Sequence, residues 1–69
     1  MVSFDKPLKF TLKELRARNN ITQMDAAKAT GVTIQTYNRW EQNPGTIPVS
    51  KFVILADYLK VDMSDIFLP

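Results

Sequence analysis

The sequence lacks two residue types on which many functional sites depend, because its 69 residues include no cysteine and no histidine. The absence of cysteine excludes a disulfide framework and is compatible with a reducing compartment. Zinc sites built from Cys and His are excluded as well, and so is an imidazole base. There is no Gly-rich phosphate loop, and Asp62 and Asp65 are better explained as helix-capping acids than as a catalytic pair. We therefore expect no cofactor, no metal and no enzymatic activity.

Long apolar stretches are also missing. No run approaches the roughly 20 residues that a membrane span requires, and the N-terminus lacks the apolar block of a secretory signal. We expect a soluble, cytoplasmic protein. So short a chain forms a single domain over residues 1–69, in which residues 1–9 are a lead-in because Pro7 disfavours helix before it.

The net charge is only +2, but it is unevenly distributed along the chain. Residues 1–51 contain eight Lys or Arg against four Asp or Glu, whereas residues 52–69 contain one against three. A polyanion would be attracted to the first three quarters of the sequence. Because an ordinary solvated surface can carry the same charges, this distribution only supports an argument made from other features.

Capping residues divide the chain into short helices. Thr11, Thr22 and Thr33 stand where N-caps belong, and Glu14 completes a capping box with Thr11. Gly31 suits the left-handed end of the helix that Thr22 begins. The expected helices run to about residue 18 after Thr11, over 22–30, over 34–42, from Pro48 to 59, and after Asp62 through Ile66 and Phe67. Such short connections predict a compact all-α bundle of five helices.

The stretch of residues 22–42 has the properties of two helices that cross through a tight turn, because its first half is rich in small alanines and Gly31 supplies the turn. In the second half, Tyr37 and Trp40 are three residues apart and share one face. If that face is buried, the opposite face carries the polar set of Gln35, Thr36, Asn38 and Arg39. The sequence therefore predicts a helix-turn-helix.

The outward residues of the second helix match the chemistry of base edges. Amide side chains pair with adenine, Arg pairs with guanine, and an exposed Ile34 would suit a thymine methyl group. The alternative for each residue alone is an ordinary solvated surface, since single exposed apolar residues are normal. The combination of residues, rather than any one of them, favours DNA reading.

These residues resemble the Cro/phage-repressor helix-turn-helix family, often called XRE-like, over residues 8–68. The most specific parts of the resemblance are Thr22-Gln23, Ala27, Gly31-Val32, Arg39-Trp40-Glu41 and the segment from Leu55 to Leu59. The resemblance implies a five-helix, lambda-repressor-like DNA-binding domain of prokaryotic or phage type, with its helix-turn-helix at about residues 22–42. It is a resemblance to the short Cro-like members, so we expect no small-molecule effector domain.

The resemblance also implies roles for individual positions. The residues that match phosphate-contacting positions are Thr22, Gln23, Gln42 and Asn43. The residues that match positions facing the major groove and its base edges are Thr33, Ile34, Gln35, Asn38 and Arg39. Arg16 and Glu41 match a buried ion pair that ties the first helix to the third.

The leading hypothesis is a sequence-specific transcriptional regulator, a repressor, which occupies a double-stranded DNA operator. One small domain with an uncharged loop at residues 43–47 contacts few phosphates, so we expect a homodimer, which could form only on DNA, with half-sites about 34 Å apart. Ile66-Phe67-Leu68 is the nominated dimer surface, although Ile66 and Phe67 could equally close the monomer core. The alternative is a protein-interaction module, such as an anti-repressor or antitoxin-like partner, that keeps the fold without reading DNA.

Overall fold

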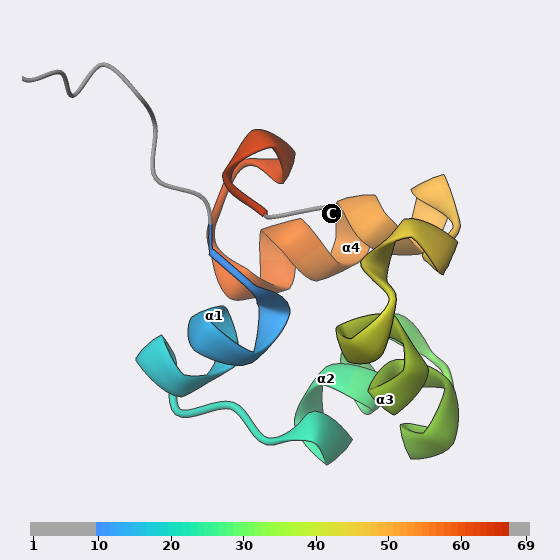
Figure 1. Cartoon of the computed structure of the whole chain (residues 1–69). Coiled ribbons are helices and arrows are strands. Elements are labelled where there is room, and N and C mark those ends of the chain that lie inside the picture. The colour runs from blue at the N-terminus through green and yellow to red at the C-terminus, as the bar shows by residue number, and fades with distance from the viewer. Residues whose placement is uncertain (1–9, 67–69) are drawn as a thin grey trace, which may run out of the picture.

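The structure is a computed structural model that describes residues 10–66, and this part of the chain folds into four α-helices and two short 3-10 helices (Figure 1). Their bounds are α1 (Leu12–Arg18), α2 (Gln23–Thr30), α3 (Ile34–Gln42), η1 (Pro44–Thr46), α4 (Val49–Leu59) and η2 (Met63–Asp65). The prediction of an all-α fold is confirmed. None of these helices is long and apolar enough to cross a membrane.

The helix starts follow from side chains that satisfy free backbone N–H groups. Thr11 and Glu14 form the expected capping box, in which the Glu14 carboxylate accepts from the Thr11 N–H at 2.8 Å. Thr22 and Asp25 form a second box at the start of α2, and the Thr33 hydroxyl accepts from the backbone of Thr36 at 3.2 Å to begin α3. Local sequence therefore sets where each of the first three helices begins.

The turn between α2 and α3 is short and has a fixed shape. Gly31 has φ +74°, the left-handed conformation that favours glycine. Beyond it, the Val32 N–H donates to the carbonyl of Ala27 at 3.0 Å, which closes the end of α2. The Lys51 ammonium, which comes from α4, donates to the Thr30 carbonyl at 2.7 Å. The turn is thus held from within and from a neighbouring helix.

The core lies where α2 packs against α3 and α4. Small side chains on α2, Ala26 and Ala27, are almost fully buried and allow the close approach of its two neighbours. The large members of the core come from every α-helix except α2 and from the segment after α4: Leu12, Leu15, Tyr37, Trp40, Leu55, Leu59 and Ile66. The core therefore joins the helix-turn-helix to the helices around it.

The expected fifth helix is wrong. Only three residues, Met63–Asp65, form a 3-10 turn, although the Asp62 and Asp65 side chains do make the predicted capping box. Ile66 is extended instead and forms a parallel bridge with Phe10, whose N–H donates to the Asp65 carbonyl at 2.9 Å. In this extended conformation Ile66 lies in the core at 1% exposure. Phe67 and Leu68 lie outside the described residues.

Candidate nucleic-acid interface

Helix α3 has one buried side and one outward side. Tyr37 and Trp40 are buried, with their rings edge to face and their centroids 6.1 Å apart. The outward side carries five residues at helical spacing: Ile34, Gln35, Asn38, Arg39 and Gln42. Four of these are exposed, and Asn38, in the middle, is half-buried. The division matches the pattern of one face for packing and one for contact.

The outward side of α3 consists of two parallel rows with different partners. Gln35 and Arg39 are four residues apart and form one row, and within residues 10–66 neither side chain has a hydrogen-bond partner. Ile34, Asn38 and Gln42 form the other row, and two of its members are hydrogen-bonded to each other. The first row is therefore chemically available, whereas the second is partly engaged.

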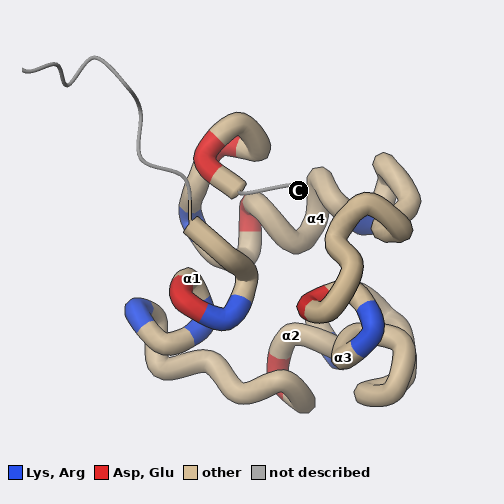
Figure 2. The backbone as a smooth tube through the Cα atoms, in the orientation of Figure 1, with Lys and Arg blue, Asp and Glu red and all other residues tan. Residues whose placement is uncertain are grey.

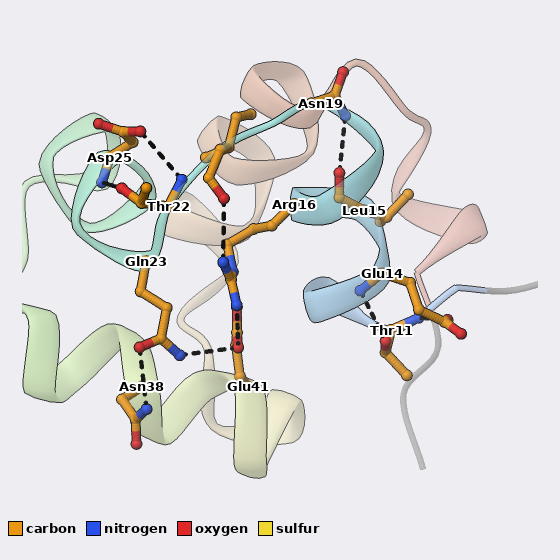
Figure 3. A network of polar contacts seen from close by, with 11 residues as sticks. Thr11, Glu14, Leu15, Arg16, Asn19, Thr22, Gln23, Asp25, Asn38 and Glu41 are labelled. Atoms are coloured by element: carbon orange, nitrogen blue, oxygen red, sulfur yellow. Dashed lines mark hydrogen bonds and ion pairs between the residues drawn. The ribbon is translucent and has the colours of Figure 1, made fainter.

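An ion pair ties α1 to α3, and it is the pair expected between Arg16 and Glu41 (Figure 3). The Arg16 guanidinium donates through Nε to one oxygen of Glu41 and through Nη2 to the other at 3.1 Å, and its Nη1 donates to the Ile21 carbonyl at 3.1 Å. Burial alone would raise the pKa of Glu41, but hydrogen bonds from Arg16 and Gln23 outweigh it, so this pKa lies below its ordinary value. Glu41 is thus held as a carboxylate.

The Gln23 side chain, expected at a DNA phosphate, is anchored by α3. Its Nε2 donates to Glu41 Oε1 at 3.0 Å, and its Oε1 accepts from Asn38 Nδ2 at 3.4 Å (Figure 3). At the other end, Asn38 Oδ1 accepts from Gln42 Nε2 at 3.0 Å. Three carboxamides therefore form a chain that ends at the Glu41 carboxylate.

The remaining expected contact residues lie at the ends of the same helices. Thr22 is exposed at the start of α2, beside Gln23. The Thr33 hydroxyl donates to the hydroxyl of Thr36 at 3.1 Å, so both its functions there serve the cap. Asn43 is exposed at the C-terminal end of α3, where its N–H donates to the Arg39 carbonyl at 2.8 Å. The structure thus brings all the expected contact residues to α3 and the N-terminal end of α2.

Two residues near this surface escaped the sequence reasoning. Met24 is 53% exposed and lines a shallow, open hollow together with Gln23 and Ile34. The spacing of the buried residues on α2 could have placed Met24 outward. Lys51, which holds the end of α2, had no local signal because it lies 21 residues away from its partner Thr30.

Buried within the same region is one unusual polar group, the hydroxyl of Tyr37. It has no hydrogen-bond partner among the described residues, although Tyr37 is fully buried. Burial raises the pKa of this phenol above its usual range, and the nearby Glu41 carboxylate raises it further. Tyr37 is therefore a neutral packing residue.

The acidic residues at and after the C-terminal end of α4 form a group that is separate from α3. In Figure 2 the acidic positions after α4 lie on the side of the molecule away from α3. Asp57 in the last turn of α4 and the two acids after that helix, Asp62 and Asp65, border a shallow polar hollow with Lys60. Within residues 10–66 no group of three or more His, Cys, Asp or Glu could hold a metal ion. The acidic side of the molecule is thus separated from the side that carries Gln35 and Arg39.

Comparison with known families identifies a match. The model of the family HTH_3, described as helix-turn-helix, matches residues 12–66, a range that includes all four α-helices and both 3-10 helices. No curated protein and no solved structure matches the chain significantly. The family match covers well over half of the 69 residues. The chain therefore belongs to the helix-turn-helix family HTH_3, of the XRE/Cro type.

Proposed function

We propose that the protein is a transcriptional regulator, a repressor, that binds a specific double-stranded DNA operator with α3 in the major groove. Family membership implies DNA binding and transcriptional regulation in general. The observation that carries the specific proposal is the outward row of Gln35 and Arg39, whose donors and acceptors are unused within the described residues. Such side chains discriminate bases by bidentate hydrogen bonds in the major groove.

Contacts at both ends of this row complete the proposed interface. Ile34 is 37% exposed and lines the open hollow together with Met24, and it is the proposed contact for a thymine methyl group. Thr33, the N-cap of α3, lies at the same end of the helix and is proposed as a further base contact. The proposed phosphate contacts are polar groups that flank α3: Thr22, Gln23, Gln42 and Asn43. Uncharged contacts of this kind orient the domain without adding much to its salt dependence.

The test is selection from a random duplex library at low salt, carried out with the parent chain and with Arg39→Ala. We expect the parent to enrich one motif, and Arg39→Ala to lose preference at one base pair by about 1–3 kcal/mol of discrimination. Lys13→Ala is the matched control, because it removes one charge from an exposed position on α1. It should weaken binding to all duplexes alike. If the parent enriches no motif, the proposal fails.

We also propose that the protein binds its operator as a homodimer, because one domain of this size makes few base contacts. Ile66, part of the nominated dimer surface, is buried and closes the monomer core instead. The exposed apolar residues in the described part of the chain that could serve lie on α4: Val49, Val53, Ile54 and Tyr58. Sedimentation with and without an operator duplex measures the stoichiometry. One protein per duplex at saturation would contradict the dimer.

The exposed apolar residues of α4 favour a second candidate function, a protein-interaction module that keeps the fold without reading DNA. Val49, at 76% exposure, is the most exposed of these large apolar residues. Salt distinguishes the two functions, because the attraction between DNA and the basic residues of the chain weakens as salt rises, whereas an apolar protein interface is not weakened. Under this second function, Arg39→Ala and Gln35→Ala would leave complex formation unchanged.

A further inference from the structure

The outward side of α3 contains an asparagine whose two polar atoms are already engaged. Asn38 Oδ1 accepts from Gln42, and its Nδ2 donates to Gln23, so the carboxamide lies between two residues of the proposed phosphate-contacting set. Reading adenine requires the oxygen and the nitrogen of one amide to face the same base edge. In Asn38 the oxygen faces Gln42 and the nitrogen faces Gln23, so the two atoms are turned toward different partners. Its position in the middle of α3 therefore does not by itself make it a reader.

The orientation of all three carboxamides follows from one charge. A carboxylate can only accept hydrogen bonds, so Glu41 requires the nitrogen of Gln23 to face it. The oxygen of Gln23 then faces Asn38 and requires the nitrogen of Asn38, and the oxygen of Asn38 in turn requires the nitrogen of Gln42. Reversing any one amide would set two acceptors or two donors against each other. This row of hydrogen bonds therefore has a single direction.

This direction leaves N–H groups that can donate to phosphate on both glutamines. An amide nitrogen has two N–H groups, and Gln23 and Gln42 each use one of them within the described residues. The second N–H of each remains a donor, and phosphate oxygens accept from such donors. The two glutamines come from the start of α2 and the end of α3, on either side of Asn38.

We propose that Asn38 is a positioning residue, which orients the amides of Gln23 and Gln42 for the DNA backbone, while base preference comes from Gln35 and Arg39. This inference rests on the proposed DNA-reading function. It divides the outward side of α3 into two rows: Gln35 and Arg39 determine base preference, and Asn38 supports the backbone contact of Gln42. Asn38 then raises the affinity for every duplex equally and does not contribute to discrimination between bases.

The first test compares Asn38→Ala with Gln35→Ala by the same library selection and by titration of a random-sequence duplex. We expect Asn38→Ala to weaken binding to the selected and the random duplex by the same factor, roughly 3- to 10-fold, with the base preferences unchanged. Gln35→Ala should flatten preference at one base pair. Titrating the active fraction with excess selected duplex corrects for any loss of folded protein.

The second test asks whether Asn38 acts through the two glutamines. In a background of Gln23→Ala with Gln42→Ala, adding Asn38→Ala should change the dissociation constant less than twofold, because the amides it orients are gone. A merely structural role would give the same loss in both backgrounds. The side-chain amide resonances of Gln23 supply an independent readout, and they should shift in Asn38→Ala and stay in place in Gln35→Ala.

Two outcomes overturn the inference while the parent still selects a motif. One is flattened preference at a single base pair in Asn38→Ala with unchanged affinity for the random duplex. The other is an equal loss of affinity in the parent and in the background without the glutamines. If the parent itself selects no motif, the proposed function fails first, and the inference fails with it.

Discussion

Helices α3 and α4 are held in the molecule by different kinds of contact. Helix α4 is fixed mainly by an apolar stripe, in which Leu55, Ala56 and Leu59 are buried and Phe52 is half-buried. Helix α3 also buries two aromatic residues, but polar side chains tie it to α1 and α2 through Glu41 and Asn38 (Figure 3). Among the described residues, two side-chain hydrogen bonds join α4 to other helices: Lys51 donates to the Thr30 carbonyl, and Asn19 at the end of α1 donates to the Leu59 carbonyl.

The difference has a functional meaning. Apolar burial stabilises a helix without fixing its rotation closely, because the hydrophobic effect is not directional. Hydrogen bonds and ion pairs depend on angle, so they fix the helix in one orientation. A helix that presents side chains to base edges needs such an orientation, whereas a supporting helix does not. We therefore expect changes on α4 to alter stability, and changes to the polar ties of α3 to alter binding as well.

The largest effect on stability should come from Leu55→Ala, which removes a fully buried side chain of α4. The free energy of unfolding should fall by about 2–5 kcal/mol, because a cavity adds to the lost burial. Base preference of the folded fraction should stay unchanged. Urea denaturation and library selection measure the two effects. Val53→Ala, on the exposed side of the same helix, is the control and should change stability by less than about 0.5 kcal/mol.

Glu41→Ala should cost somewhat less stability and should also weaken DNA binding. It leaves the Arg16 guanidinium partly buried without its partner, a loss of about 3 kcal/mol. The informative comparison is Arg16→Met with Glu41→Leu, which replaces both charges by apolar groups. This double variant should recover much of the stability and little of the affinity, because Gln23 loses its acceptor in both cases. Full recovery of affinity would contradict the role given to polar ties.

A smaller effect should appear on acidification. The folded-state pKa of Glu41 is lowered, so its contribution to stability is complete above the ordinary value of 4.5 and is lost as pH falls through the folded-state pKa. Asp25, whose pKa is lowered by its hydrogen bonds with Thr22, acts in the same direction. Melting temperatures below pH 4.5 should therefore fall less steeply in Glu41→Gln than in the parent. If the two melting temperatures fall in parallel, the hydrogen bonds of ionised Glu41 do not stabilise the folded state.

Tyr37→Phe should have the smallest effect of all. The hydroxyl of Tyr37 is buried without a hydrogen-bond partner among the described residues, so its removal should leave stability unchanged or raise it by up to about 1 kcal/mol. Thermal unfolding measures the change. A loss larger than about 1 kcal/mol would show that the hydroxyl is hydrogen-bonded in solution.

The sequence predicted the features that depend on neighbouring residues. Thr11, Thr22 and Thr33 cap helices where expected, and Gly31 has the expected left-handed conformation, because these roles involve backbone groups only a few residues away. The fifth helix was predicted wrongly for the opposite reason, because the structure after α4 depends on a distant residue. Ile66 pairs with Phe10, and no local pattern contains that distant partner.

The candidate site shows the same limit. Helical spacing was sufficient to place Gln35 and Arg39 on the outward side of α3. It could not reveal that Asn38 is engaged by Gln23, because that contact joins residues 15 apart and depends on how α2 and α3 cross. Residue type and spacing identify which side chains can make a contact. The relative position of two helices decides which of them are free to make it.

The conformation of the turn at Gly31 sets the direction in which α3 leaves α2. Helix α3 begins three residues after Gly31 and has nine residues, so its far end lies about 13 Å from its start. A tilt of about 10° at the turn would move that end by about 2 Å, which is comparable to the length of the hydrogen bonds that discriminate bases. Any side chain at Gly31 would be strained by its φ of +74°. The left-handed Gly31 therefore fixes the direction in which α3 begins, while the polar ties of Glu41 and Asn38 hold the rest of the helix in place.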